Sequence, residues 1–258
     1  MNTTAEKKIR VTIWNEFHDD KRWKIITDLY PGGVHAYLGK VLGEQNTDFE
    51  ITVKTLDDPD QGLSDELLDQ TDVLLWYSHV RDHLVESGRI QKIISRVVGE
   101  GMGLIFLHSG VFSTLAKSLI GPRGGGAYRE IEELERVFVI DRSHPIADGL
   151  PEYFEFPASE MYSEPNDIPT PDELVFISWY AGGNVGRSGY TYKRGAGKVF
   201  CFTPGHSWYD VMLYPEFHQV VANGIRWAKP VSRPAVQSRG RIEALIPQRT
   251  EQYHPENV

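Results

Sequence analysis

The sequence has one cysteine, no long hydrophobic run and no excess of positive charge, and each absence excludes a class of protein. A single cysteine, Cys201, cannot form an intramolecular disulfide, so a disulfide framework is excluded. The longest apolar runs, at 73–77 and 199–202, are far shorter than the roughly 20 residues that span a bilayer. Residues 1–10 are polar and lack the apolar core of a secretory signal. We therefore expect a cytoplasmic protein with no membrane partner.

The charge and length of the chain restrict its partners and its domain organisation. A net charge of −9 repels nucleic-acid phosphates and anionic membranes at long range. With 40% hydrophobic and 24% charged residues, the composition is that of a globular protein. The 258 residues suit one large α/β domain, which we expect over 1–230. The charged, proline-containing tail at 231–258 is expected on the surface or against another subunit, which favours a homo-oligomer.

Apolar runs alternate with helical patterns along the first half of the chain. This rhythm predicts a doubly wound, mostly parallel α/β sheet of the flavodoxin type, in which helices cross over between strands. The expected strands are 9–15, 49–55, 72–78 and 103–108, and the expected helices are 34–43, a short one from Ser64, 84–98 and 111–120. Beyond Gly121 the strands follow one another without long helices, at 136–140, 173–180, 189–192 and 198–203. They predict an antiparallel extension, followed by a last helix at 215–228.

Several polar residues come directly after the buried strands. These are Asn15 and Glu16, then His79, His108 and His206. The carboxyl ends of parallel strands lie along one edge of a sheet, where ligands of such folds bind. We therefore expect residues distant in sequence to line one crevice there.

His79 and His83 have the i, i+4 spacing that puts two imidazoles on one face of a helical turn. His35, at the start of the first crossover helix, is the expected third ligand. Three neutral nitrogens with an open position favour zinc over magnesium or calcium, which prefer oxygen ligands. The alternative is that all three are ordinary solvated or hydrogen-bonded histidines.

Three further residues are candidates for proton transfer. His108 lies in a tight strand-to-helix elbow with small neighbours, where histidine would act as a proton carrier or ligand and Ser109 is an alternative nucleophile. His206 is followed by aromatic residues that suit a sugar face as well as ordinary burial. Glu160 lies in an acidic segment, 160–164, which we expect to be a loop that offers a general acid or base. The glycines at 124–126 lack the lysine of a phosphate-binding loop, and no nucleotide fingerprint is present.

Taken together, several segments resemble the ThuA-like trehalose utilisation proteins. They are WNEF (14–17), YPGGVH (30–35), DVLLWYSHVRDH (72–83), GLIFLHSG (103–110), SHPIADGL (143–150), EMY (160–162), PDELVFISWYAGG (171–183) and KVFCFTPGH (198–206). The resemblance implies the class I glutamine amidotransferase-like fold and a role in the breakdown of trehalose or related disaccharides, with keto-sugar intermediates. The amidotransferases have a catalytic cysteine at the elbow where this chain has His108, so glutaminase activity is not expected.

The sequence thus supports two hypotheses of different classes. The first is a metal-dependent enzyme that isomerises, epimerises or hydrolyses a sugar or keto-sugar. In this enzyme His35, His79 and His83 hold a divalent metal, for which zinc is the expected ion. His108, His206 or Glu160 then moves the proton. The second is a non-catalytic sugar-binding or regulatory subunit of a disaccharide pathway.

Overall fold

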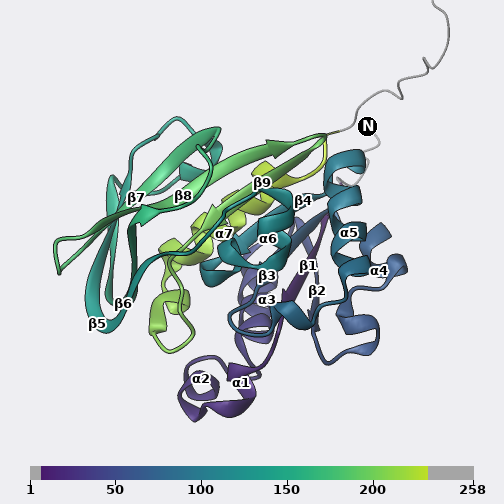
Figure 1. Ribbon diagram of the computed structural model, residues 1–258, viewed down its shortest axis with the longest axis horizontal. Coiled ribbons are helices and arrows are strands. Elements are labelled where there is room, and N and C mark those ends of the chain that lie inside the picture. The colour runs from purple at the N-terminus through teal and green to yellow at the C-terminus, as the bar shows by residue number, and fades with distance from the viewer. Residues whose placement is uncertain (1–6, 232–258) are drawn as a thin grey trace, which may run out of the picture.

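A computed structural model describes residues 7–231, which form one α/β structure around a single sheet. Its strands are β1 (Ile9–Asn15), β2 (Phe49–Thr55), β3 (Val73–Tyr77), β4 (Gly103–Leu107), β5 (Gly126–Val139), β6 (Tyr153–Asn166), β7 (Glu173–Tyr180), β8 (Val185–Arg194) and β9 (Gly197–Phe202). The nine strands lie in the order β2-β1-β3-β4-β9-β8-β7-β5-β6 (Figure 1). The tail expected at 231–258 lies outside the described residues apart from Val231.

The helices are mostly short and fall between the strands of the first half. They are α1 (Asp19–Arg22), α2 (Lys24–Leu29), α3 (Val34–Gln45), α4 (Asp65–Asp69), α5 (Ser87–Ser95), α6 (Thr114–Leu119) and α7 (Pro215–Ala228). Single turns of other helix types are η1 (Pro59–Gly62), η2 (Asp82–Leu84), η3 (Arg96–Glu100), η4 (His108–Phe112), η5 (Pro145–Ala147) and η6 (Asp210–Leu213). None of the helices in this described part is long and apolar enough to cross a membrane.

The sheet is parallel in one half and antiparallel in the other. Strands β2, β1, β3, β4 and β9 pair in parallel, and their order is that of a flavodoxin-like sheet. From β9 through β8, β7 and β5 to β6 every pair is antiparallel. The expectation of a mostly parallel sheet is therefore not confirmed. The connections beyond β5 carry no long helix, and a parallel return needs a crossover of a dozen or more residues.

Two hydrophobic cores show that the parallel half is covered on both faces. Ile13, Leu75 and Ile105 belong to one core, which also contains side chains of α3 and α7. Alternate residues of the same strands, Trp14 and Phe106 among them, belong to the other core with side chains of α5 and α6. Successive residues of a strand point to opposite faces, so this division confirms the doubly wound arrangement. Strands β5, β6 and β7 lie to the left of these helices in Figure 1.

Two segments expected to be loops are regular structure instead. The charged segment at 18–22, which its sequence predicts to be a loop after the first strand, forms α1 from Asp19 to Arg22. Asp19 and Asp20 lie in the first turn and basic residues in the last turn, where they complement the helix dipole. The acidic segment at 160–164 lies within β6, paired with β5, so the loop prediction was wrong. Alternate side chains of this strand face a polar site rather than an apolar core, which hides the strand pattern in the sequence.

Candidate active site

Three histidines meet at the carboxyl edge of the parallel strands. His79, His108 and His206 follow β3, β4 and β9, which are neighbours in the sheet. The ring centroids are 6.3 Å apart for His79 and His108, 5.2 Å for His79 and His206, and 5.1 Å for His108 and His206. The position predicted for these rings from topology is therefore confirmed.

The backbone at His108 forms a strained elbow. Its φ is 50°, in the left-handed region that costs a residue with a β-carbon about 1 kcal/mol or more. Two residues later, a β-carbon added to Gly110 would lie 2.9 Å from the carbonyl oxygen of Trp76, so the chain needs glycine there to pass this closely. The His108 ring stacks on that of Tyr162, with centroids 4.6 Å apart.

The hydrogen bonds of His108 and His206 assign their tautomers. His108 donates from Nδ1 to the Thr203 carbonyl oxygen at 2.9 Å, which leaves a lone pair on Nε2 in the neutral ring. His206 instead accepts at Nδ1 from the Trp208 amide at 3.1 Å, so its neutral ring carries the proton on Nε2. Burial, together with the neighbouring histidines, lowers the pKa of His206 to about 2. The His206 ring is therefore uncharged at neutral pH.

His79 is held by two carboxylates of the first βα connection. It donates from Nδ1 to Asp19 at 2.8 Å, and this hydrogen bond raises the pKa of His79 and lowers that of Asp19. The buried carboxylate of Glu16 accepts from the amides of Val80 and Arg81 at 2.9 and 2.8 Å. Glu16 thus fixes the chain after β3, while Asp19 orients the imidazole itself.

Glu160 brings a buried carboxylate from β6 to the same place. Its Oε2 lies 3.0 Å from His108 Nε2 and 4.0 Å from His206 Nε2. All three atoms are buried, and none has a hydrogen-bond partner among residues 7–231. One ligand atom from each of these residues lies within 4.8 Å of the other two. A second such group, formed by His79, Glu130 and His206, lies on the solvent side, where Glu130 is exposed.

The group formed by His108, Glu160 and His206 fits a divalent metal ion. Buried polar atoms without partners are costly, and a cation would directly satisfy the two acceptors, His108 Nε2 and Glu160 Oε2. Two ligands of a tetrahedral zinc ion with bonds of 2.0–2.1 Å are roughly 3.3 Å apart, close to the separation of His108 and Glu160. Two imidazoles and a carboxylate also suit zinc chemically. Binding through His206 Nε2 would require its proton to move, which makes His206 the weakest of the three ligands.

The structure does not bring His35 or His83 into either group. His35 is buried beside Phe17 and 3.4 Å from the Asn15 amide nitrogen, and burial lowers its pKa. His83 is exposed in the η2 turn. In the part of the chain that the structure describes, the groups of three ligand atoms contain neither residue. A metal held by His35, His79 and His83 stays a prediction, which this geometry does not favour.

A crevice of about 260 Å³ opens beside the histidines. It is lined by His79, Asp82, Ser109, Phe112, Ser113, Tyr128, Glu130, Glu160 and Tyr162.

Sequence reasoning missed three carboxylates: Asp19, Glu130 and Glu135. Glu135 is fully buried and accepts hydrogen bonds from Ser159, Ser178 and Tyr180 at 2.6, 2.6 and 3.0 Å. Burial raises the pKa of Glu135. In the sequence, only polar residues that directly follow a buried strand could be recognised as candidates for the site. Asp19 lies in α1, and Glu130 and Glu135 lie within β5.

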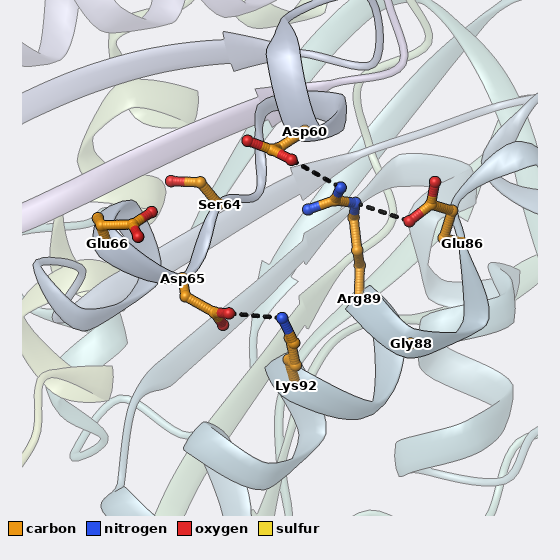
Figure 2. Close-up of a pocket in the computed structure, with 8 residues that line it drawn as sticks. All are labelled: Asp60, Ser64, Asp65, Glu66, Glu86, Gly88, Arg89 and Lys92. Atoms are coloured by element: carbon orange, nitrogen blue, oxygen red, sulfur yellow. Dashed lines mark hydrogen bonds and ion pairs between the residues drawn. The ribbon is translucent and has the colours of Figure 1, made fainter.

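Another hollow, of about 300 Å³, lies away from the histidines beside α4 and α5. Figure 2 shows Arg89 between Asp60 and Glu86, and Lys92 beside Asp65. Both cations of this hollow are paired with carboxylates, so neither is left to bind an anionic ligand.

Comparison with known proteins assigns the chain to a family. The family model ThuA, described as trehalose utilisation, matches residues 10–228. The chain belongs to the ThuA family. No curated protein matches it. The match spans β1 to α7 and so includes every residue of the histidine crevice.

Solved structures, two of them described as ThuA-like, share the fold at low sequence identity. A ThuA-like protein from Bacteroides uniformis is 16% identical with a TM-score of 0.64, over 88% of this chain and 94% of the other. One from Parabacteroides merdae is 12% identical with a TM-score of 0.66, over 88% and 93%. A cytoplasmic protein from Salmonella typhimurium is 11% identical with a TM-score of 0.57, over 86% and 100%. These likenesses support the fold alone.

The single cysteine of this ThuA chain is not placed for nucleophilic chemistry. Cys201 is buried within β9, and burial raises the pKa of its thiol. A buried thiol with a raised pKa is inert, because the thiolate is the nucleophile. The elbow position is held by His108, as the sequence indicated.

Proposed function

We propose that this protein is a metal-dependent enzyme that acts on a sugar or keto-sugar by isomerisation, epimerisation or hydrolysis. The observation that carries the proposal is the meeting of three buried, unpartnered atoms of His108, Glu160 and His206. The substrate class is supported by the family description, trehalose utilisation. Zinc is the proposed ion because two nitrogens and one carboxylate oxygen supply the ligands.

The geometry supports exchanging the roles that the sequence suggested for the histidines. We assign His108, Glu160 and His206 as the residues that hold the metal, which when bound would polarise a substrate carbonyl or hydroxyl. His79 then becomes the proton carrier, because its pKa is raised by Asp19 and its ring faces His206. A histidine that is oriented by a carboxylate is well suited to general acid or base catalysis. In the opposite assignment, His79 binds the metal and His108, His206 or Glu160 moves the proton.

Other residues of the crevice would bind and orient the substrate. The hydroxyl of Tyr162 and the carboxylate of Glu130 line the crevice beside His79, where they can hydrogen-bond sugar hydroxyls. The Ser109 hydroxyl is already directed to the carbonyl oxygen of Ser78 at 2.8 Å. That hydrogen bond holds the elbow and makes Ser109 a poor nucleophile.

The rival is a non-catalytic sugar-binding or regulatory subunit, which would keep the crevice but needs no proton transfer. Turnover of a keto-disaccharide by the purified protein separates the two. The enzyme hypothesis requires turnover that is abolished by chelation and restored by zinc. Tight binding of the sugar without turnover, in the presence of zinc, would support the rival.

We also propose that the protein acts in the cytoplasm as a homo-oligomer, without nucleic-acid or membrane partners. The negative net charge supports the absence of a nucleic-acid partner. The description of the Salmonella typhimurium neighbour as cytoplasmic supports the location. Light scattering of the purified protein measures the oligomeric state directly.

A further inference from the structure

Two exposed tryptophans contact each other, and one of them lies beside His206. Trp208 follows β9 and Trp23 precedes α2, and their side chains keep 38% and 42% of their surface in solvent. Their rings meet edge to face with centroids 5.6 Å apart. The Trp208 ring is also 5.6 Å from the ring of His206. Aromatic side chains of this size usually bury most of their surface, so the pair forms an apolar surface directly beside the proposed metal ligands.

Neighbouring groups hold both tryptophans in place. The Trp208 amide donates to His206 Nδ1 at 3.1 Å, which ties its backbone to the site. The hydroxyl of Tyr30, from the end of α2, donates to the Tyr209 carbonyl oxygen and accepts from the Met212 amide. The guanidinium of Arg22 lies over the Trp23 ring, 5.5 Å from its centroid. A surface fixed in this way loses little conformational entropy when a ligand binds.

We propose that Trp208 and Trp23 bind one sugar ring of a disaccharide, while the other ring lies at the histidine crevice. The inference rests on the proposed function, because it extends the same site. The apolar C–H face of a pyranose fits an aromatic ring, and its edge hydroxyls remain free for water or polar side chains. The spacing of Trp208 and His206 is about the width of one sugar ring, so adjacent rings of one substrate can occupy both places. The pair therefore confers preference for disaccharides over monosaccharides.

Calorimetric titration with trehalose and with glucose tests this subsite. The wild-type protein should bind trehalose more tightly than glucose. Trp208→Ala and Trp23→Ala should each weaken trehalose binding by roughly 3- to 10-fold, the contribution of an aromatic contact, and change glucose binding by less than about 2-fold. Trp208→Phe keeps an aromatic face and should lose less than Trp208→Ala.

The control is Tyr153→Ala, which removes an exposed aromatic residue on β6 that packs against Phe138. It should leave both affinities unchanged. If the tryptophan variants bind trehalose as the wild type does, or if the wild type binds the two sugars equally, the subsite is wrong while the proposed function stands. If the zinc-loaded wild type binds neither sugar, the subsite is wrong, and turnover of a keto-disaccharide decides the proposed function separately.

Discussion

His108 directs a lone pair, not an N–H, at the carboxylate of Glu160. Its Nδ1 proton is committed to the Thr203 carbonyl oxygen, and its Nε2 lies 3.0 Å from Glu160 Oε2. Two acceptors at this distance repel each other unless a proton or a cation lies between them. Both atoms are buried, so water cannot relieve the repulsion. This contact is the physical basis of the metal proposal.

Glu160→Gln distinguishes the two ways of relieving that repulsion, which are a proton and a metal cation between His108 and residue 160. The amide of glutamine can donate to His108 Nε2, so the variant should be at least as stable as the wild type in the presence of a chelator. It should, however, lose the stabilisation by zinc, which for the wild type is about 2.7 kcal/mol at a free zinc concentration of 100 times Kd. Thermal unfolding with and without zinc measures both effects. An equal zinc-dependent rise in the Tm of both proteins would contradict the assignment of Glu160.

His79→Gln and His206→Gln should have different consequences. His79→Gln removes the proposed proton carrier. It should reduce turnover of a keto-disaccharide by roughly 100-fold or more and leave metal content unchanged. His206→Gln should lower metal content together with turnover. His83→Gln, at an exposed position, is the control and should change neither quantity. Metal loss in the His79 and His83 variants, with metal retained in the His206 variant, would instead support the ligand set suggested by the HxxxH spacing.

Asp19→Asn should lower the pKa of His79. The carboxylate of Asp19 raises that pKa in the folded protein through the hydrogen bond to Nδ1. The pKa of His79 is therefore higher in the folded protein than in the unfolded chain. The stability that the Asp19–His79 pair contributes is complete below the unfolded pKa of His79 and is lost as pH rises through its folded pKa. NMR titration of the imidazole in metal-free protein should show its midpoint at lower pH in the variant. An unchanged midpoint would show that Asp19 does not control His79.

At position 108, glycine should be better tolerated than alanine. Both substitutions remove the ring and its contacts, but only alanine keeps a β-carbon at the φ of 50°. His108→Gly should therefore be about 1 kcal/mol more stable than His108→Ala, the reverse of the usual order in helices and strands. Urea unfolding of the two variants measures the difference. A more stable alanine variant would argue against strain at the elbow.

The parallel half of the fold was predictable because its strands are covered on both faces. Residues 73–77 and 103–107 are entirely buried, so each appears in the sequence as an uninterrupted apolar run. The antiparallel half was underestimated, because its strands alternate apolar and polar residues and several polar positions face the site. Glu135 and Glu160 lie on such strands, where a buried carboxylate obscures the strand pattern.

The positions of the histidines followed from topology, but their partners did not. His79, His108 and His206 were predictable as a group because parallel strands present their carboxyl ends at one edge. The spacing of His79 and His83 does not place them on one α-helical turn, because the chain between them is held by Glu16 and enters a single 3₁₀ turn. Asp19 and Glu130 reach the crevice only through tertiary packing, which no local pattern records.

Metal content tests the central claim most directly. Elemental analysis of the purified wild-type protein, after incubation with zinc and removal of free metal, should find about one divalent ion per chain. The His108→Ala/Glu160→Ala double variant should contain almost none, provided that circular dichroism shows it folded, and Glu160→Gln serves as the milder variant if it is not. Metal well below one ion per chain in the wild type despite added zinc, or a full complement retained in the folded variants, would contradict the account.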